Sequence, residues 1–277
     1  MIEYPPLFAD FLAFERQVFG DPRPIALYDP YLIRYGEYRF ILGSLPLEAG
    51  VDVVDLGCET NLLMLFLAIR RANVIGLDLD PALAQTVEER KELVHKVTGV
   101  EPSLQFVVGD ATNHNLRPSS ADVVVATSSI EHMFSDLGHG DQLAVDGIRR
   151  VLRPGGIAAI TVPMSNGAPF HESPTGDERF AGPYRLYTPA VLAKRLLSNP
   201  ELRTAQHKYL AHATPDPTSE DGRFHQFWLE LTPEERLKWS WANPILSAVF
   251  NPIVGAEEEP GREAALNTAL LLLQKKG

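Results

Sequence analysis

Residues 51–61 read VDVVDLGCETN. The β-branched apolar run at 51–56 predicts a buried strand, and the glycine that follows it, Gly57, marks a tight turn. The segment 61–71, NLLMLFLAIRR, comes next and is long and apolar enough for a buried helix. Strand, tight loop and helix in this order predict the first unit of an α/β sheet.

The same alternation continues along the chain. Further strands are predicted at 73–80, 103–109, 122–128, 157–163, 203–211 and 265–274, and further helices at 81–97, 141–152 and 189–198. Strands that alternate with helices form a parallel sheet covered on both faces. The sequence therefore predicts a doubly wound α/β fold, built as one domain with embellishments.

Composition narrows the classes of function. The chain of 277 residues has a formal net charge of -11, which repels phosphate backbones and argues against a nucleic-acid partner. No apolar run approaches the roughly 20 residues that cross a bilayer, and the start MIEYPPLF shows no secretory signal, so we expect a cytoplasmic protein without a membrane span. Cys58 is the single cysteine and the histidine spacing matches no ligand pattern, so we predict no disulfide and no metal.

Acidic residues stand at the ends of two predicted strands. Ligands of an open parallel sheet bind beyond the carboxyl ends of the strands. A carboxylate at Asp78 can accept hydrogen bonds from both ribose hydroxyls of a nucleoside, and Asp110 can accept one from an adenine amino group. Either side chain could instead cap a turn. Because each ends its strand within an ordered set, we favour contact with a ligand.

Five blocks in a fixed order carry a resemblance to a known family: VDVVDLGCETN, VIGLDLD, VVGDAT, ADVVVATSSIEHM and RRVLRPGGIAAITVP. Over about residues 50–165 the chain resembles the class I S-adenosylmethionine-dependent methyltransferases. The resemblance implies a Rossmann-like, mostly parallel seven-stranded sheet whose last strand is antiparallel. It also implies S-adenosylmethionine as cofactor and S-adenosylhomocysteine as product.

The resemblance also implies where the cofactor would be held. The end of the first strand and the loop after it match the turn around the methionine part of the cofactor. The end of the second strand matches the ribose contact, and the end of the third matches the adenine contact. The end of the fourth strand matches the floor between cofactor and acceptor. In the same order these are Asp55, Gly57, Cys58, Glu59 and Asn61; Asp78 and Leu79; Asp110 and Ala111; and Thr127 with Ser128.

The first loop departs from the family pattern Gly-x-Gly-x-Gly, because Glu59 and Asn61 occupy its second and third glycine positions. A glutamate there must point away from the ligand or crowd it, and it can repel the cofactor's carboxylate or accept from its ammonium. Asparagine tolerates left-handed backbone and can cap a helix. Cys58 has no nearby histidine in sequence to activate it, which favours a loop-filling role.

Glu131 and His132 are the candidates for proton transfer. Methyl transfer from a sulfonium is an in-line displacement that alignment in a dry pocket accelerates, so few reactive groups are needed. For an acceptor hydroxyl or amine that must lose a proton, His132 would serve as general base. The alternative is structural, because a glutamate in the first turn of a helix is favoured by the helix dipole.

The sequence predicts a helical cover of the same domain at 1–50 and the methyltransferase domain at 51–277. Within it, the loop 164–187 and the insert 215–262 are expected to cap the acceptor side. The polar side chains of that loop, including Tyr184 and Arg185, either orient an acceptor or stay solvated. The aromatic amino-terminal segment either closes over the cofactor or pairs with a second subunit as a homodimer.

The predicted function is S-adenosylmethionine-dependent methyl transfer to a small-molecule, saccharide or lipid-linked acceptor. The alternative is a non-catalytic binding or scaffold protein on the same fold, motivated by Glu59 and Asn61. A nicotinamide dehydrogenase fits poorly, because the Gly-x-Gly-x-x-Gly phosphate cradle is missing from the first loop.

Overall fold

The computed structural model describes residues 5–19, 31–46, 48–136, 138–165, 168–176, 182–212, 247, 253–255 and 265–277. The chain forms two compact units. One consists of Met1–Gly43 and Lys208–Thr268, and the other of Ser44–His207 and Ala269–Gly277. Among the described residues, no helix combines the length and the apolar character that crossing a membrane requires.

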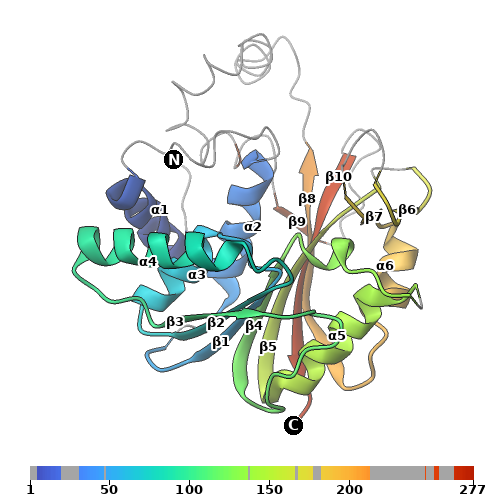
Figure 1. The fold of residues 1–277 in the computed structure, drawn as a ribbon. Coiled ribbons are helices and arrows are strands. Elements are labelled where there is room, and N and C mark those ends of the chain that lie inside the picture. Colours follow the sequence, from blue (N-terminus) through green and yellow to red (C-terminus); the bar gives the residue numbers. More distant parts are fainter. Residues whose placement is uncertain are drawn as a thin grey trace, which may run out of the picture. The chain divides into compact units, whose positions relative to one another are not determined.

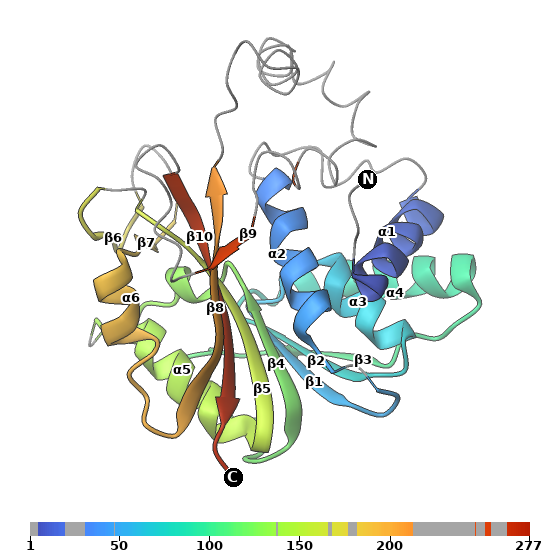
Figure 2. The same ribbon diagram turned by 180° about the vertical axis from the view of Figure 1, so that it is seen from behind.

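One eight-stranded sheet has the order β3-β2-β1-β4-β5-β10-β8-β9 (Figure 1). Its strands are β1 Asp52–Leu56, β2 Asn73–Asp78, β3 Leu104–Val108, β4 Ala121–Thr127, β5 Leu152–Pro163, β8 Leu202–His212, β9 Ile253–Gly255 and β10 Ala265–Lys275. The pairs among β1 to β5 are parallel. Figure 2 shows β10 running opposite to β8. The predicted doubly wound sheet with an antiparallel closing strand is confirmed, and β9 adds an eighth strand.

Four helices of the second unit cover the sheet: α3 Leu62–Ile69, α4 Leu83–Thr98, α5 Gly140–Val151 and α6 Pro189–Arg195. The chain moves from β1 toward β3 through α3 and α4, and in the opposite direction from β4 to β5 through α5. Right-handed crossovers therefore place these two sets of helices on opposite faces of the sheet, as Figures 1 and 2 show. The order of the strands reverses between β1 and β4, where ligands of such folds bind.

Local sequence explains where α3 and α4 start. The side-chain oxygen of Asn61 accepts a hydrogen bond from the Met64 N–H at 2.9 Å and caps α3. The second helix was predicted to start at Pro81, but α4 starts at Leu83. Asp80 instead accepts from the Ala82 N–H at 2.8 Å and forms a turn before the helix.

A two-stranded antiparallel hairpin lies within the predicted loop 164–187. Its strands are β6 His171–Ser173 and β7 Tyr184–Leu186. Between β4 and α5, the short 3-10 helix η2 spans Ile130–His132. The predicted polar loop is therefore in part a defined element, and the hairpin contacts η2.

The first unit contains α1 Pro6–Phe19, α2 Tyr31–Ser44 and strand β9. The aromatic side chains predicted to mark this segment pack together, with Phe11 edge-on to Tyr38 at 5.2 Å between ring centroids. Glu15 is buried among them and accepts the Tyr35 hydroxyl. Apart from Ser247 and β9, the insert 215–262 lies outside the described residues.

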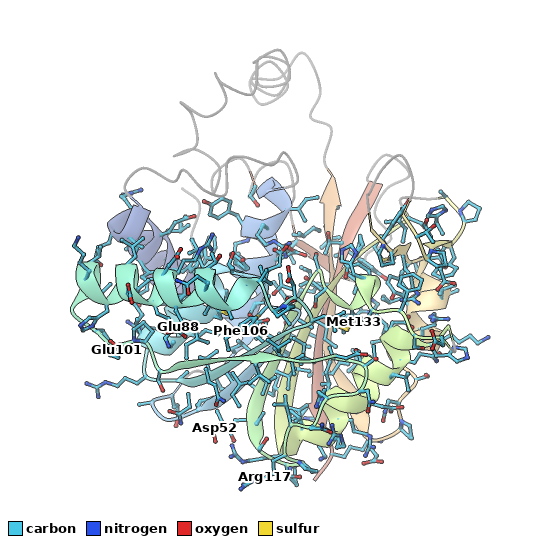
Figure 3. The ribbon with its side chains drawn as sticks, viewed as in Figure 1. Asp52, Glu88, Glu101, Phe106, Arg117 and Met133 are labelled. Carbon is cyan, nitrogen blue, oxygen red and sulfur yellow. The ribbon has the colours of Figure 1, made fainter. Side chains whose placement is uncertain are left out.

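The amino ends of the strands are joined by Arg153. Its guanidinium lies 2.6 Å from both Asp52 of β1 and Asp122 of β4. A cavity of about 560 Å³ opens at this edge, with Asp52, Arg117 and Arg153 among its lining. Figure 3 shows Asp52 and Arg117 at the end of the sheet opposite to Met133. Since ligands of this fold bind beyond the carboxyl ends, the cavity is not the candidate active site.

Candidate active site

The loop after β1 needs a glycine at its first position. Gly57 has φ 65°, and a Cβ there would lie 2.6 Å from Cβ of Ser129. The Gly57 N–H donates to the Leu77 carbonyl at 2.8 Å, which fixes the turn against the end of β2. Left-handed backbone and missing space both exclude a side chain here.

Glu59 keeps the backbone shape that glycine would adopt. Its φ is 45°, in the left-handed region that disfavours a glutamate. Its N–H donates to Oδ2 of Asp78 at 2.8 Å, and its side chain is exposed. The loop therefore retains its turn and is tied directly to the end of β2, and the substitution adds an exposed negative charge.

Asn61 and Asp55 are held together beneath this loop. The Asn61 side-chain amide donates to Oδ2 of Asp55 at 2.8 Å while its oxygen caps α3. Asp55 is only 1% exposed at the end of β1. The asparagine thus fixes a buried carboxylate at the carboxyl end of β1, a role that its position in the glycine pattern alone does not reveal.

Cys58 fills space in the interior. It is fully buried, and a Cβ on Gly76 would lie 2.9 Å from its Sγ. Burial raises the pKa of the Cys58 thiol far above its ordinary value, and the charges of Asp55 and Asp78 raise it further. The thiol therefore stays protonated, which supports the loop-filling role and opposes a nucleophilic one.

The second and third strand ends lie side by side. Asp78 pairs in register with Val108, so Asp78 and Asp110 occupy neighbouring positions on one edge. Oδ1 of Asp110 accepts from both the N–H and the hydroxyl of Thr112 at 2.8 Å, as a turn-capping carboxylate does. Leu79 is 70% exposed directly after Asp78, an unusual exposure for a large apolar side chain. Ala111 is buried.

The fourth strand end forms the floor of this edge. Thr127 is buried at the end of β4. Ser128 has φ 45°, and its N–H donates to Oγ1 of Thr161 at 2.9 Å. The chain then turns into η2, so Glu131 and His132 follow the floor directly.

His132 has a defined partner at one ring nitrogen. Its Nδ1 lies 2.6 Å from the carbonyl oxygen of Pro183, and its Nε2 lies 3.8 Å from Oε1 of Glu131. The His132 side chain is 48% exposed, whereas that of Glu131 is only 3% exposed. The structure thus brings the predicted pair together at the carboxyl edge, with the ring open to solvent and the carboxylate buried.

Sequence reasoning missed a buried polar network below this pair. Asp141 accepts two hydrogen bonds from Arg195, at 2.6 and 2.7 Å, and one from the Tyr187 hydroxyl at 3.0 Å. These hydrogen bonds and the nearby Arg185 hold the pKa of Asp141 below its ordinary value, although burial alone would raise it. The three chain segments involved are distant in sequence, so no local pattern marks the network.

Part of the sequence is similar to known proteins. Residues 54–160 match the family described as methyltransferase domain. A curated relative, trans-aconitate 2-methyltransferase of Paracidovorax citrulli, is 29% identical over 136 residues, which are 48% of this chain and 46% of that protein. The match therefore spans about half the length of the curated relative.

Solved structures share the fold. The [4+2]-cyclase SpnF is 18% identical, with a TM-score of 0.55 over 89% of this chain and 81% of its own. An S-adenosylmethionine-dependent methyltransferase from Methanosarcina mazei is 12% identical, with a TM-score of 0.54 over 83% of this chain and 94% of its own. At these identities the likeness concerns the fold alone.

The sheet order, the strand-end residues and the matched domain define a class of protein. Over residues 54–160 the chain is similar to the methyltransferase domain, and its sheet has the Rossmann-like strand order of solved methyltransferase structures. The matched domain and the fold imply S-adenosylmethionine as the cofactor.

Proposed function

We propose that this protein transfers a methyl group from S-adenosylmethionine to a small-molecule, saccharide or lipid-linked acceptor. The observation that carries the proposal is the hydrogen bond from the Glu59 N–H to Asp78 Oδ2. This bond ties the loop after β1 to the end of β2. Glu59 keeps the left-handed backbone of the turn although it stands in place of a glycine. This turn supports cofactor binding at the ends of β1 and β2, and the match to the methyltransferase domain supports methyl transfer.

The residues at this edge fit the cofactor. When bound, the cofactor supplies an electrophilic methyl group on a sulfonium. Its methionine part would lie against Asp55 and the turn at 57–61, and its ribose against Asp78. Leu79, already exposed in water, would gain apolar contact from the adenine face. Oδ1 of Asp110 accepts both hydrogen bonds that Thr112 donates, so Oδ2 would accept one from an adenine amino group.

We assign general-base catalysis to His132. The Pro183 carbonyl can only accept a hydrogen bond, so the imidazole proton sits on Nδ1 and the lone pair on Nε2. Nε2 would accept the proton of an acceptor hydroxyl or amine. Glu131 Oε1, 3.8 Å from Nε2, would stabilise the imidazolium that forms. A general base of this kind contributes about 100-fold or more to a rate.

The acceptor can be sought by chemistry. The name of the curated relative gives trans-aconitate as that protein's acceptor, so the first panel should contain tricarboxylates beside sugars, amines and lipid-linked sugars. We expect radioactive methyl transfer from labelled S-adenosylmethionine to a member of this panel. We propose that the protein acts in the cytoplasm. Asp78→Ala should abolish the transfer by removing the ribose contact. Transfer that survives Asp78→Ala would contradict the assigned site.

A second candidate is a protein that keeps the fold without methyl transfer. The exposed Glu59 carboxylate beside the cofactor edge favours it, because it can repel the carboxylate of the cofactor's methionine part. This candidate requires weak or absent cofactor affinity. Tight binding of S-adenosylmethionine would exclude it.

We also propose that the loop 164–187 and the insert 215–262 cap the acceptor side. The aromatic amino-terminal segment either closes over the cofactor or forms a homodimer interface. Light scattering of the purified protein distinguishes these two roles of the amino-terminal segment. A monomer would exclude the dimer interface and leave closure over the cofactor. A dimer that dissociates on mutation of Leu12, which is half-buried on α1, would support the interface.

A further inference from the structure

Arg185 of β7 is a buried charged side chain. It is 0% exposed, and a buried guanidinium is expensive unless all its donors are satisfied. Its Nε donates to Oε1 of Glu172 at 2.7 Å. Within the described part of the chain, its Nη2 has no hydrogen-bond acceptor. A side chain kept under these conditions is expected to hold a particular geometry.

The guanidinium joins the β6–β7 hairpin to the segment that follows His132. Nη1 donates to the Met133 carbonyl at 2.8 Å, and the guanidinium carbon lies 3.6 Å from the centroid of the Phe134 ring. Both contacts use the planar, charged shape of arginine, which lysine lacks. Met133, the residue whose carbonyl accepts the hydrogen bond from Nη1, is labelled in Figure 3. Arg185 therefore clamps two elements against each other.

The same hairpin places a carbonyl oxygen against one ring nitrogen of His132. Pro183 stands two residues before Arg185 in the hairpin, and its carbonyl lies 2.6 Å from Nδ1. Neutral imidazole has one N–H and one lone pair, and the nitrogen facing a carbonyl must carry the N–H. If the hairpin moved away, the ring would lose this preference and both tautomers would be populated.

We propose that Arg185 is a positioning residue that keeps Pro183 against His132 Nδ1 and so leaves Nε2 free to take the proton of the acceptor. This inference rests on the proposed function. In the step it serves, the acceptor's proton passes to Nε2 and the electron pair of that bond forms the new bond to the methyl carbon. The electron pair of the broken carbon–sulfur bond stays on sulfur. Nδ1–H remains on the Pro183 carbonyl throughout.

The test observes the tautomer directly and needs no acceptor. Protein labelled with ¹⁵N-histidine is studied by two-bond ¹H–¹⁵N correlation at a pH where imidazoles are neutral, and His132→Asn assigns the signal. We expect the Nδ1–H tautomer in the wild type. In Arg185→Lys, the share of this tautomer should fall by about twofold or more, because lysine cannot make the three contacts together.

Arg149→Lys is the matched control. Arg149 pairs with Glu201 at 3.0 Å on α5, away from the hairpin, so its replacement should leave the His132 signal unchanged. If Arg185→Lys does not fold, Glu172→Gln is used instead. It removes the ion pair that fixes the Arg185 guanidinium, with little change in shape, and should lower the Nδ1–H share too.

A wild-type His132 in the Nε2–H form would overturn the inference. So would an unchanged tautomer in folded Arg185→Lys or, where that variant fails to fold, in Glu172→Gln. Cofactor binding is measured separately by calorimetry on the same samples. If the wild-type protein does not bind the cofactor, the proposed methyl transfer is wrong. The tautomer result would still decide the role of Arg185.

Discussion

Left-handed backbone at two positions shapes the loop that would hold the methionine part of the cofactor. Gly57 is required for both conformation and space, whereas Glu59 occupies a similar conformation with a side chain. The two positions differ because Gly57 faces Ser129, whereas Glu59 faces solvent. This difference explains how one glycine of the family pattern can be lost without loss of the turn.

Gly57→Ala is predicted to damage both the fold and cofactor binding. The added Cβ would meet Ser129 at 2.6 Å, and left-handed alanine costs about 1–2 kcal/mol before any clash. Gly50→Ala is the control, because Gly50 has φ 87° with nothing within 4 Å of the added Cβ. Urea unfolding should show a clearly larger loss for Gly57→Ala. Equal losses would contradict the close approach to Ser129.

Glu59→Gly is predicted to tighten cofactor binding. It removes a negative charge near the expected carboxylate of the cofactor, an effect of about 1 kcal/mol or about fivefold in Kd. Arg71→Gly is the control, since Arg71 also has a left-handed φ, 67°, but lies outside the loop. Calorimetry that finds the same gain in both variants, or none in Glu59→Gly, would show that Glu59 does not oppose the ligand.

At the scale of single elements, the start of α3 couples stability to the site. Asn61→Ala should cost about 1 kcal/mol of unfolding free energy through loss of the cap, and should weaken cofactor binding because Asp55 loses its amide partner. Thr188→Ala removes the equivalent cap of α6, where Oγ1 accepts the Val191 N–H. It should destabilise the protein with cofactor affinity intact. A similar loss of affinity in both variants would refute the coupling.

The pair of helices α1 and α2 carries a pH-dependent contact. Burial raises the pKa of Glu15 from 4.5 to about 7, although its hydrogen bond from Tyr35 lowers it in part. The folded state therefore binds a proton that the unfolded state has released between these values, and the stability it contributes is lost as pH rises through about 7. Glu15→Gln should remove this dependence, which amounts to roughly 3 kcal/mol in the wild type. Unfolding curves whose pH dependence is unchanged in Glu15→Gln would contradict this burial.

Elements with strong local signals could be predicted from the sequence, and elements defined by distant contacts could not. The apolar runs at 51–56 and 265–274 became β1 and β10 because burial in a sheet follows directly from composition. The β6–β7 hairpin lacks such a run, and its burial depends on the contacts of Arg185 with Glu172 and Met133. The sequence therefore left open whether Arg185 was solvated, and the structure shows it fully buried.

At the scale of the whole molecule, the order of the strands brings the candidate site together. The ends of β1, β2 and β3 carry Asp55, Asp78 and Asp110 on one edge, and the reversal of order at β4 brings His132 to the same edge. Residues separated by long stretches of sequence thus share one site because parallel strands end together. The strand ends could be predicted; the hairpin partner of His132 depends on a contact between residues 51 positions apart.

The central claim is that this edge binds S-adenosylmethionine, and calorimetric titration of the purified protein tests it most directly. We predict micromolar binding of S-adenosylmethionine and S-adenosylhomocysteine and no binding of NAD, with affinity lost in Asp78→Ala. Absence of binding by both sulfur compounds, or preference for NAD, would contradict the account.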